Sequence, residues 1–219
     1  TIAEVQPRTI FHLAAKKHVK YAERALRNAV QTNVFGTANV LAAAEAAACV
    51  RNVVFASSDK AVAAANVLGE TKRVAERLMT AFAAQWTRGR AASVRLCNVL
   101  GTAGNVLDHY VDEAKRGVTL DVWSRDMTRY FCSVYEAADL FLHAALRAGA
   151  PVITLDTGPP TAIAELAARV CGILAGHGIP ARYEVTERFG AMHARHEELW
   201  LDSEVISRPL TTPDVAGIT

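Results

Sequence analysis

Four consecutive residues that can exchange protons or donate hydrogen bonds follow a short apolar run in the first third of the sequence. They are Ser57, Ser58, Asp59 and Lys60. The run before them, Val53 to Ala56, has the length and β-branched content of a buried parallel strand. Ligands bind at the carboxyl ends of the strands in open α/β sheets. The sequence therefore predicts that two hydroxyls, a carboxylate and an amine lie together at a binding edge of a sheet.

A second lysine, Lys72, follows within a helical pattern. Leu68, Lys72, Ala75 and Met79 recur at three- or four-residue spacing, which places them on one helix face. A lysine on this face can point back toward the strand end. The alternative is an ordinary polar loop with a helix cap followed by a solvated helix lysine, because strand ends and helix caps favour the same small polar residues.

Composition excludes several classes of protein. About half of the 219 residues are hydrophobic, and 24 Lys and Arg stand against 22 Asp and Glu. This balance favours a folded protein without a charge-driven nucleic-acid or membrane partner, although an anionic small substrate stays open. There is no long apolar run and no signal segment. The four cysteines are widely spaced without a CxxC pair, so we expect reduced thiols, no metal site and a cytoplasmic location.

Hydrophobic patterning predicts an α/β protein with a parallel sheet flanked by helices. The expected strands are Thr9 to Leu13, Val53 to Ala56, Ala91 to Leu96 and Val152 to Leu155. The expected helices include Glu23 to Ala48, the stretch after Asn66, Tyr135 to Leu146 and Thr161 to Leu174.

Two blocks in this pattern are specific enough to indicate a family. SSDKA at 57 to 61 and NVLGETK at 66 to 72 resemble the S-T-D-K-A and N-V-[MY]-G-x-T-K segments of the extended short-chain dehydrogenase/reductases. Within these enzymes they resemble the polysaccharide-biosynthesis (CapD-like) branch of UDP-N-acetylglucosamine 4,6-dehydratases. The resemblance implies a Rossmann-like doubly wound parallel sheet with a smaller C-terminal substrate-binding lobe.

The resemblance also implies a division of the chain. Residues 1 to 103 would be the C-terminal part of the dinucleotide-binding domain. Residues 104 to 219 would be mainly the substrate lobe, with a return to the sheet near 132 to 157. No GxGxxG before a helix occurs, and the GxG at Gly176 to Gly178 precedes Ile-Pro-Ala. We therefore expect the chain to lack the first βαβ units and, by itself, to bind NAD or NADP weakly.

Carried over by residue, the resemblance implies the reacting groups. Asp59 would act as the acid, Lys60 as the base at sugar C5, and Ser58 as a hydrogen-bond partner of the C4 oxygen. Lys72 would hold the nicotinamide ribose. The further cofactor-binding residues implied are Ala14, Ala15, Asn33 and Ser57. In the family, the glycine equivalent to Gly36 lets a helix approach the sheet closely.

The remaining blocks would bind a UDP-sugar substrate. The residues implied are Lys17, His18, Asn98, Arg129 and Arg188. Asn98 and Arg129 would carry the diphosphate, which suits the planar fork of an arginine. Ala103 replaces an arginine of the family loop, and the block at 187 to 199 is altered around Arg188.

Two functions therefore stay open. The first is an NAD(P)-dependent UDP-sugar 4,6-dehydratase, with or without C5 epimerisation, that forms a homo-oligomer. The second is a non-catalytic relative that binds a nucleotide sugar or pairs with an active subunit. Leu68 favours the second, because relatives carry tyrosine or methionine there and leucine has no polar atom.

Overall fold

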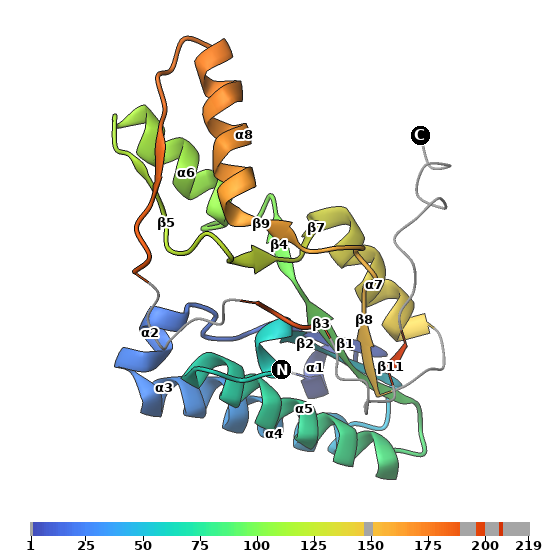
Figure 1. Ribbon diagram of the computed structural model, residues 1–219. Helices are drawn as coiled ribbons and strands as arrows, with labels where there is room; N and C mark the ends of the chain where they lie inside the picture. Colours follow the sequence, from blue (N-terminus) through green and yellow to red (C-terminus); the bar gives the residue numbers. More distant parts are fainter. Residues whose placement is uncertain (1, 147–150, 189–195, 200–205, 208–219) are drawn as a thin grey trace, which may run out of the picture. The chain divides into compact units, whose positions relative to one another are not determined.

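The computed structural model describes residues 2–146, 151–188, 196–199 and 206–207, which form two compact units (Figure 1). Unit 1 comprises Thr1–Leu96, Glu136–Asp156 and Glu198–Thr219, and unit 2 comprises Cys97–Tyr135 and Thr157–Glu197. The chain first passes from unit 1 to unit 2 after Leu96, and not near residue 103. Consequently Asn98 lies in the smaller unit.

Unit 1 is built on a parallel sheet, as the sequence predicts. Its described strands are β1 (Thr9–His12), β2 (Asn52–Ser58), β3 (Arg90–Leu96), β8 (Val152–Thr154) and β11 (Ile206–Ser207), in the order β1-β2-β3-β8-β11. Each neighbouring pair is parallel. Because β2 lies between β1 and β3, the candidate residues leave an internal strand.

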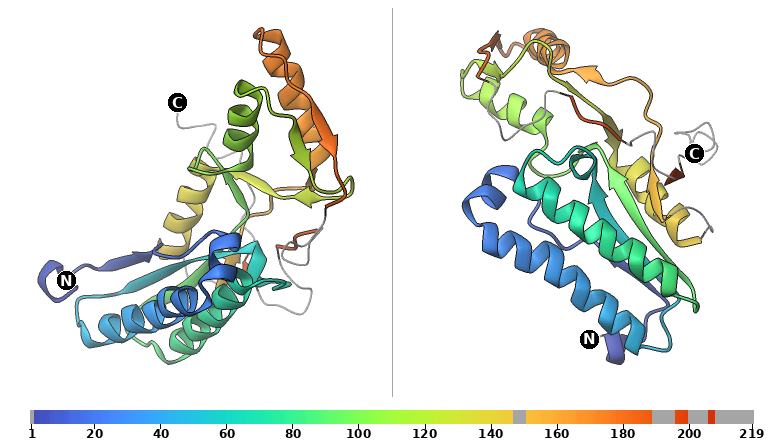
Figure 2. Two further views of the ribbon diagram at one scale, coloured as in Figure 1. Left: turned by 90° about the vertical axis from the view of Figure 1, so that its left-hand side faces the viewer. Right: turned by 60° about the horizontal axis from the view of Figure 1, so that its bottom comes forward.

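Helices cover both faces of this sheet. Figures 1 and 2 show α4 (Gly36–Ala46) and α5 (Val67–Gln85) on one face and α7 (Val134–Leu146) on the other. Successive side chains of β1 point to opposite faces of the sheet. His12 hydrogen-bonds Thr37 of α4 on one face, whereas the Phe11 ring contacts Phe141 of α7 on the other. The doubly wound arrangement is therefore confirmed.

The single helix expected over Glu23 to Ala48 is wrong. After the short α1 (Ile2–Val5), the structure has α2 (Val19–Arg24), α3 (Leu26–Val30), a π-helical turn η1 (Gln31–Phe35) and then α4. Ala25 leaves the helical region, with φ −129° and ψ 51°, and interrupts the helix between α2 and α3. The π-turn is a local widening of the helix that often accompanies functional sites.

The core of unit 1 fills the space between β2 and the helices α4 and α5. Val53 and Phe55 of β2 pack with Leu41 of α4 and with Ala75 and Met79 of α5. The apolar face predicted for α5 is thus the face that meets the sheet.

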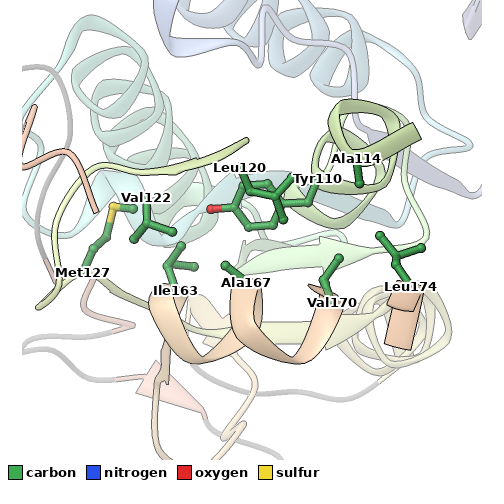
Figure 3. Packing of buried hydrophobic residues seen from close by; sticks show 9 residues of the cluster. All are labelled: Tyr110, Ala114, Leu120, Val122, Met127, Ile163, Ala167, Val170 and Leu174. Carbon is green, nitrogen blue, oxygen red and sulfur yellow. The ribbon is translucent and has the colours of Figure 1, made fainter. Parts of the chain in front are cut away.

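Unit 2 combines short strand pairs with two helices. β4 (Asn98–Leu100) pairs with β7 (Phe131–Ser133), β5 (Leu120–Val122) with β10 (Tyr183–Val185), and β6 (Thr128–Arg129) with β9 (Thr161–Ala162). The helices α6 (Val106–Lys115) and α8 (Ile163–Gly176) pack on β5. Figure 3 shows their shared core: Tyr110, Ala114, Leu120, Val122, Met127, Ile163, Ala167, Val170 and Leu174.

Two features are absent from the described residues. None of the helices there is both long and apolar enough to span a membrane. In the same part of the chain, no group of three or more His, Cys, Asp or Glu side chains is arranged to hold a metal ion.

Replacing Phe55 with alanine should destabilise unit 1 by about 3 to 5 kcal/mol, because it deletes a ring that is only 1% exposed and leaves a cavity. Phe35→Ala is the matched control, since Phe35 is 59% exposed and its loss should change stability by less than about 0.5 kcal/mol. Urea unfolding followed by circular dichroism compares the variants. Equal losses would contradict the core position of Phe55.

Candidate functional site

The acid–base residues gather at the carboxyl end of β2. Ser57 and Ser58 are the last two residues of the strand, and Asp59 and Lys60 open the 3₁₀ turn η2 (Asp59–Ala61). One carboxylate oxygen, Oδ1 of Asp59, accepts hydrogen bonds from the Ser58 hydroxyl at 2.8 Å and from the Lys60 backbone N–H at 2.8 Å. The Lys60 ammonium lies 3.1 Å from the same oxygen. Hydroxyl, carboxylate and amine therefore form one connected cluster.

Lys72 points from α5 back toward the end of β2, as its helical spacing predicts. Its Nζ donates to the Ala56 carbonyl at 2.7 Å and lies 4.7 Å from the centroid of the Phe55 ring. The residue is 5% exposed. Burial lowers the pKa of the Lys72 ammonium to about 8, and the Glu76 carboxylate opposes this shift. A cation that loses its proton this readily is suited to proton-transfer chemistry.

Contacts at the start of α5 explain why the block that carries Lys72, NVLGETK, contains an asparagine and a glycine. The Asn66 side chain caps the helix by accepting from the Gly69 N–H at 2.8 Å. A Cβ on Gly69 would lie 2.3 Å from the Lys60 carbonyl oxygen, so only glycine lets the helix start this close to η2. For Gly36, in contrast, an added Cβ would meet only Gln31 at 3.7 Å, so the expected close approach to the sheet is wrong there.

Asn33 holds the loop after β1 against α5. From the π-turn, its amide oxygen accepts from the Lys16 N–H at 2.8 Å, and its amide nitrogen donates to the Lys16 carbonyl at 3.2 Å and to the Thr71 hydroxyl at 3.0 Å. The residue is buried. Since both amide hydrogens are used inside the protein, Asn33 positions the loop that carries Ala14 and Ala15.

His12 is a buried polar residue that the sequence analysis does not single out. The Thr37 hydroxyl donates to the Asn33 carbonyl at 2.7 Å, so it must accept from Nε2–H of His12 at 3.0 Å. Burial, with Lys72 nearby, lowers the pKa of His12, which keeps the ring neutral. A histidine inside an otherwise apolar strand is the signal that could have indicated it.

The other candidates of unit 1 differ in exposure. Ala14, Lys17 and His18 are exposed and Ala15 is half-buried in the loop after β1. Ser57 is 4% exposed, and its hydroxyl has no hydrogen-bond partner within the described residues. An unpartnered buried hydroxyl is costly and often marks a place where a ligand binds.

In unit 2, the structure brings Asn98 and Arg129 together through Glu197. The Asn98 amide nitrogen donates to Glu197 Oε2 at 2.9 Å, and Arg129 Nε lies 3.3 Å from Glu197 Oε1. Glu197 belongs to the E-E-L end of the block at 187 to 199, which could have indicated it. Arg188 is exposed and makes no hydrogen bond or ion pair with the part of the chain that the structure describes.

Comparison with known proteins shows the family of this chain. The family model described as "Polysaccharide biosynthesis protein" matches residues 1–208. The capsular polysaccharide biosynthesis protein CapD of Staphylococcus aureus is 38% identical over 165 residues, which cover 75% of this chain and 27% of CapD. The probable polysaccharide biosynthesis protein EpsC of Bacillus subtilis is 39% identical over 163 residues, which cover 74% of this chain and 27% of EpsC. The chain thus spans about a quarter of the length of these two relatives.

Other matches extend the comparison. A UDP-glucose 4-epimerase of Rickettsia rickettsii is 34% identical over 160 residues, covering 72% of this chain and 47% of that enzyme. Among solved structures, Pen from Bacillus thuringiensis superposes with a TM-score of 0.78 at 29% identity, covering 88% of this chain and 60% of Pen. The structure of MoeE5 in complex with UDP-glucose and NAD, at 22% identity, shares the fold with a TM-score of 0.68 over 96% of this chain and 72% of MoeE5. Because the family model covers nearly the whole sequence and the relatives agree with it, the chain belongs to the polysaccharide-biosynthesis family of the extended short-chain dehydrogenase/reductases.

Proposed function

We propose that this chain is part of an enzyme that modifies a nucleotide sugar, most specifically an NAD(P)-dependent UDP-N-acetylhexosamine 4,6-dehydratase with or without inversion at C5. The observation that carries the proposal is the cluster of Ser58, Asp59 and Lys60 at the end of an internal parallel strand. The names of CapD and of the UDP-glucose 4-epimerases support a sugar-nucleotide reaction.

The residues around Lys72 fit a nicotinamide cofactor. The buried Ser57 hydroxyl has no hydrogen-bond partner within the described residues, and the Lys72 ammonium can donate to ribose hydroxyls. The small side chains of Ala14 and Ala15 leave room beside the loop that Asn33 holds. A nicotinamide cofactor held by these residues would supply hydride transfer between sugar C4 and C6.

The hydrogen bond from Ser58 to Asp59 suggests the first proton path. Ser58 Oγ takes the proton of the sugar C4 hydroxyl and passes its own proton to Oδ1 of Asp59, 2.8 Å away. Asp59 is then a carboxylic acid. It gives that proton to the departing C6 oxygen, which leaves as water.

Lys60 moves the second proton. The ketone at C4 acidifies the neighbouring C5–H, and Lys60 Nζ in its neutral form removes this proton. Protonation of Asp59 favours the neutral amine, because it cancels the negative charge that pairs with the ammonium at 3.1 Å. Lys60 later gives this proton back to C5. The proton taken from the C4 hydroxyl leaves in the water, so no proton is gained or lost by the three side chains.

A second candidate, a non-catalytic relative that binds a nucleotide sugar, is favoured by Leu68. This residue is buried with Val19, Ala22 and Ala29, one helical turn before Lys72. It contributes packing and no polar atom, so it cannot donate or accept a proton. The proposed enzyme must therefore move protons through Ser58, Asp59 and Lys60.

Replacing Lys60 with methionine should abolish exchange of the sugar C5 proton with solvent while leaving UDP-sugar affinity much less changed. Deuterium incorporation at C5 in heavy water measures the first quantity, and calorimetry measures the second. Lys115→Met, at an exposed lysine in the last turn of α6, is the control and should retain exchange. Undiminished exchange in Lys60→Met would remove Lys60 from the role, and absence of exchange in the native full-length protein would favour the non-catalytic relative.

The stability of the protein should depend on the charge of Lys72. Its pKa is lowered to about 8 in the folded protein, so between pH 8 and about 10.4 the unfolded chain binds more protons and stability rises with pH. Relative to Lys72→Met, the native free energy of unfolding should rise by about 2 kcal/mol between pH 7 and about pH 10. Urea unfolding at several pH values measures the difference. A Lys115→Met control should keep the rise, and an equal slope in native protein and Lys72→Met would show that Lys72 has an ordinary pKa.

A further inference from the structure

We infer that Glu197 fixes the side-chain amide of Asn98 so that Asn98 meets a nucleotide sugar as a hydrogen-bond acceptor and not as a phosphate ligand. The inference rests on the proposed function, because it assigns a role within nucleotide-sugar binding. It changes the expectation from the family blocks, in which Asn98 and Arg129 together carry the diphosphate.

Both hydrogens of the Asn98 amide are already committed. The amide nitrogen donates to the Tyr130 carbonyl at 3.1 Å and to Glu197 Oε2 at 2.9 Å. A primary amide has two N–H donors and no more. Asn98 therefore has no further hydrogen to offer a phosphate oxygen.

The opposite orientation of the amide is chemically excluded. Rotation by 180° would bring the amide oxygen against the Tyr130 carbonyl and the Glu197 carboxylate, which are both acceptors. Two repulsive contacts would replace two hydrogen bonds, one of them charge-assisted. The buried carboxylate of Glu197, with 4% of its side chain exposed, thus selects the orientation.

The oxygen that remains determines what Asn98 can recognise. Asn98 is half-buried, and its Oδ1 makes no hydrogen bond with any described residue. The diphosphate of a nucleotide sugar is esterified at both ends and carries no proton at neutral pH, so this oxygen would repel it. The chemistry that suits it is an uncharged donor, a hydroxyl or N–H group of the nucleoside or the sugar.

Arg129 is then the residue that binds the anionic part of the ligand. Its Nε pairs with Glu197 Oε1 at 3.3 Å, and its Nη1 donates to the Thr128 carbonyl at 2.7 Å, so two contacts orient the guanidinium. Glu197 consequently acts as a positioning residue for both side chains, each through one carboxylate oxygen.

The test compares two probes with the full-length protein, UDP-N-acetylglucosamine and inorganic pyrophosphate. Calorimetry measures the affinity of the first, and displacement of it measures the affinity of the second. Asn98→Ala should weaken UDP-N-acetylglucosamine about tenfold, the worth of one hydrogen bond, and leave pyrophosphate affinity within about twofold. Arg129→Ala should weaken both probes. Glu197→Gln should also weaken UDP-N-acetylglucosamine, whereas Glu113→Gln, at a unit 2 carboxylate that pairs with His109, should not.

A spectroscopic readout separates orientation from simple loss of structure. In native protein labelled with ¹⁵N-asparagine, the Asn98 side-chain N–H resonances should change little on ligand binding and should shift in Glu197→Gln without ligand. Equal weakening of both probes by Asn98→Ala, or a phosphorus coupling to these N–H groups, would overturn the acceptor role. If the native protein binds neither probe, the proposed function and this inference fall together. If it binds both and Asn98→Ala is unaffected, only the inference fails.

Discussion

The candidate site of unit 1 depends on how closely α5 begins against the backbone of Lys60. A side chain at Gly69 would collide with the Lys60 carbonyl, so the absence of a Cβ sets the distance between helix and strand end. Three features follow from this approach. Asn66 caps the helix at that point, Thr71 accepts from Asn33, and Lys72 comes within 2.7 Å of the Ala56 carbonyl. A helix displaced outward would lose all three together.

The electrostatics of the same helix also involve a buried ion pair. Glu76, one turn after Lys72, is held by Arg95 of β3 through both carboxylate oxygens at 2.9 and 2.7 Å. A carboxylate engaged this fully by a guanidinium offers less stabilisation to a neighbouring ammonium. Burial is the larger of the two effects that set the pKa of Lys72, and the Glu76 carboxylate is the smaller.

The sequence was sufficient to predict features that depend on local periodicity. The central strand and the parallel sheet follow from short apolar runs, and the face of α5 that carries Lys72 follows from spacing of three or four residues. Ala25 and the π-turn escaped prediction because the alanine and valine residues there continue an apolar helical pattern. The π-turn is held by contacts of Asn33 with Lys16 and Thr71, at sequence separations of 17 and 38. Glu197 was missed for the same reason, since 99 residues separate it from Asn98.

The interleaving of the two units along the chain bears on how the protein is made. Each unit is assembled from separated segments, so neither is complete when the first half of the chain has left the ribosome. β3 ends at Leu96, but its partner β8 begins only at Val152. Ser93 therefore pairs with a residue that is synthesised 59 residues later. Through that interval β3 has an unpaired edge, which is a site for wrong pairing with another chain. In unit 2, β5 likewise stays unpaired until β10, which begins at Tyr183, has been synthesised. Synthesis of the second half therefore covers the β3 edge with β8 first and the β5 edge with β10 later, and rapid translation of residues 97–185 would shorten the exposure of both edges.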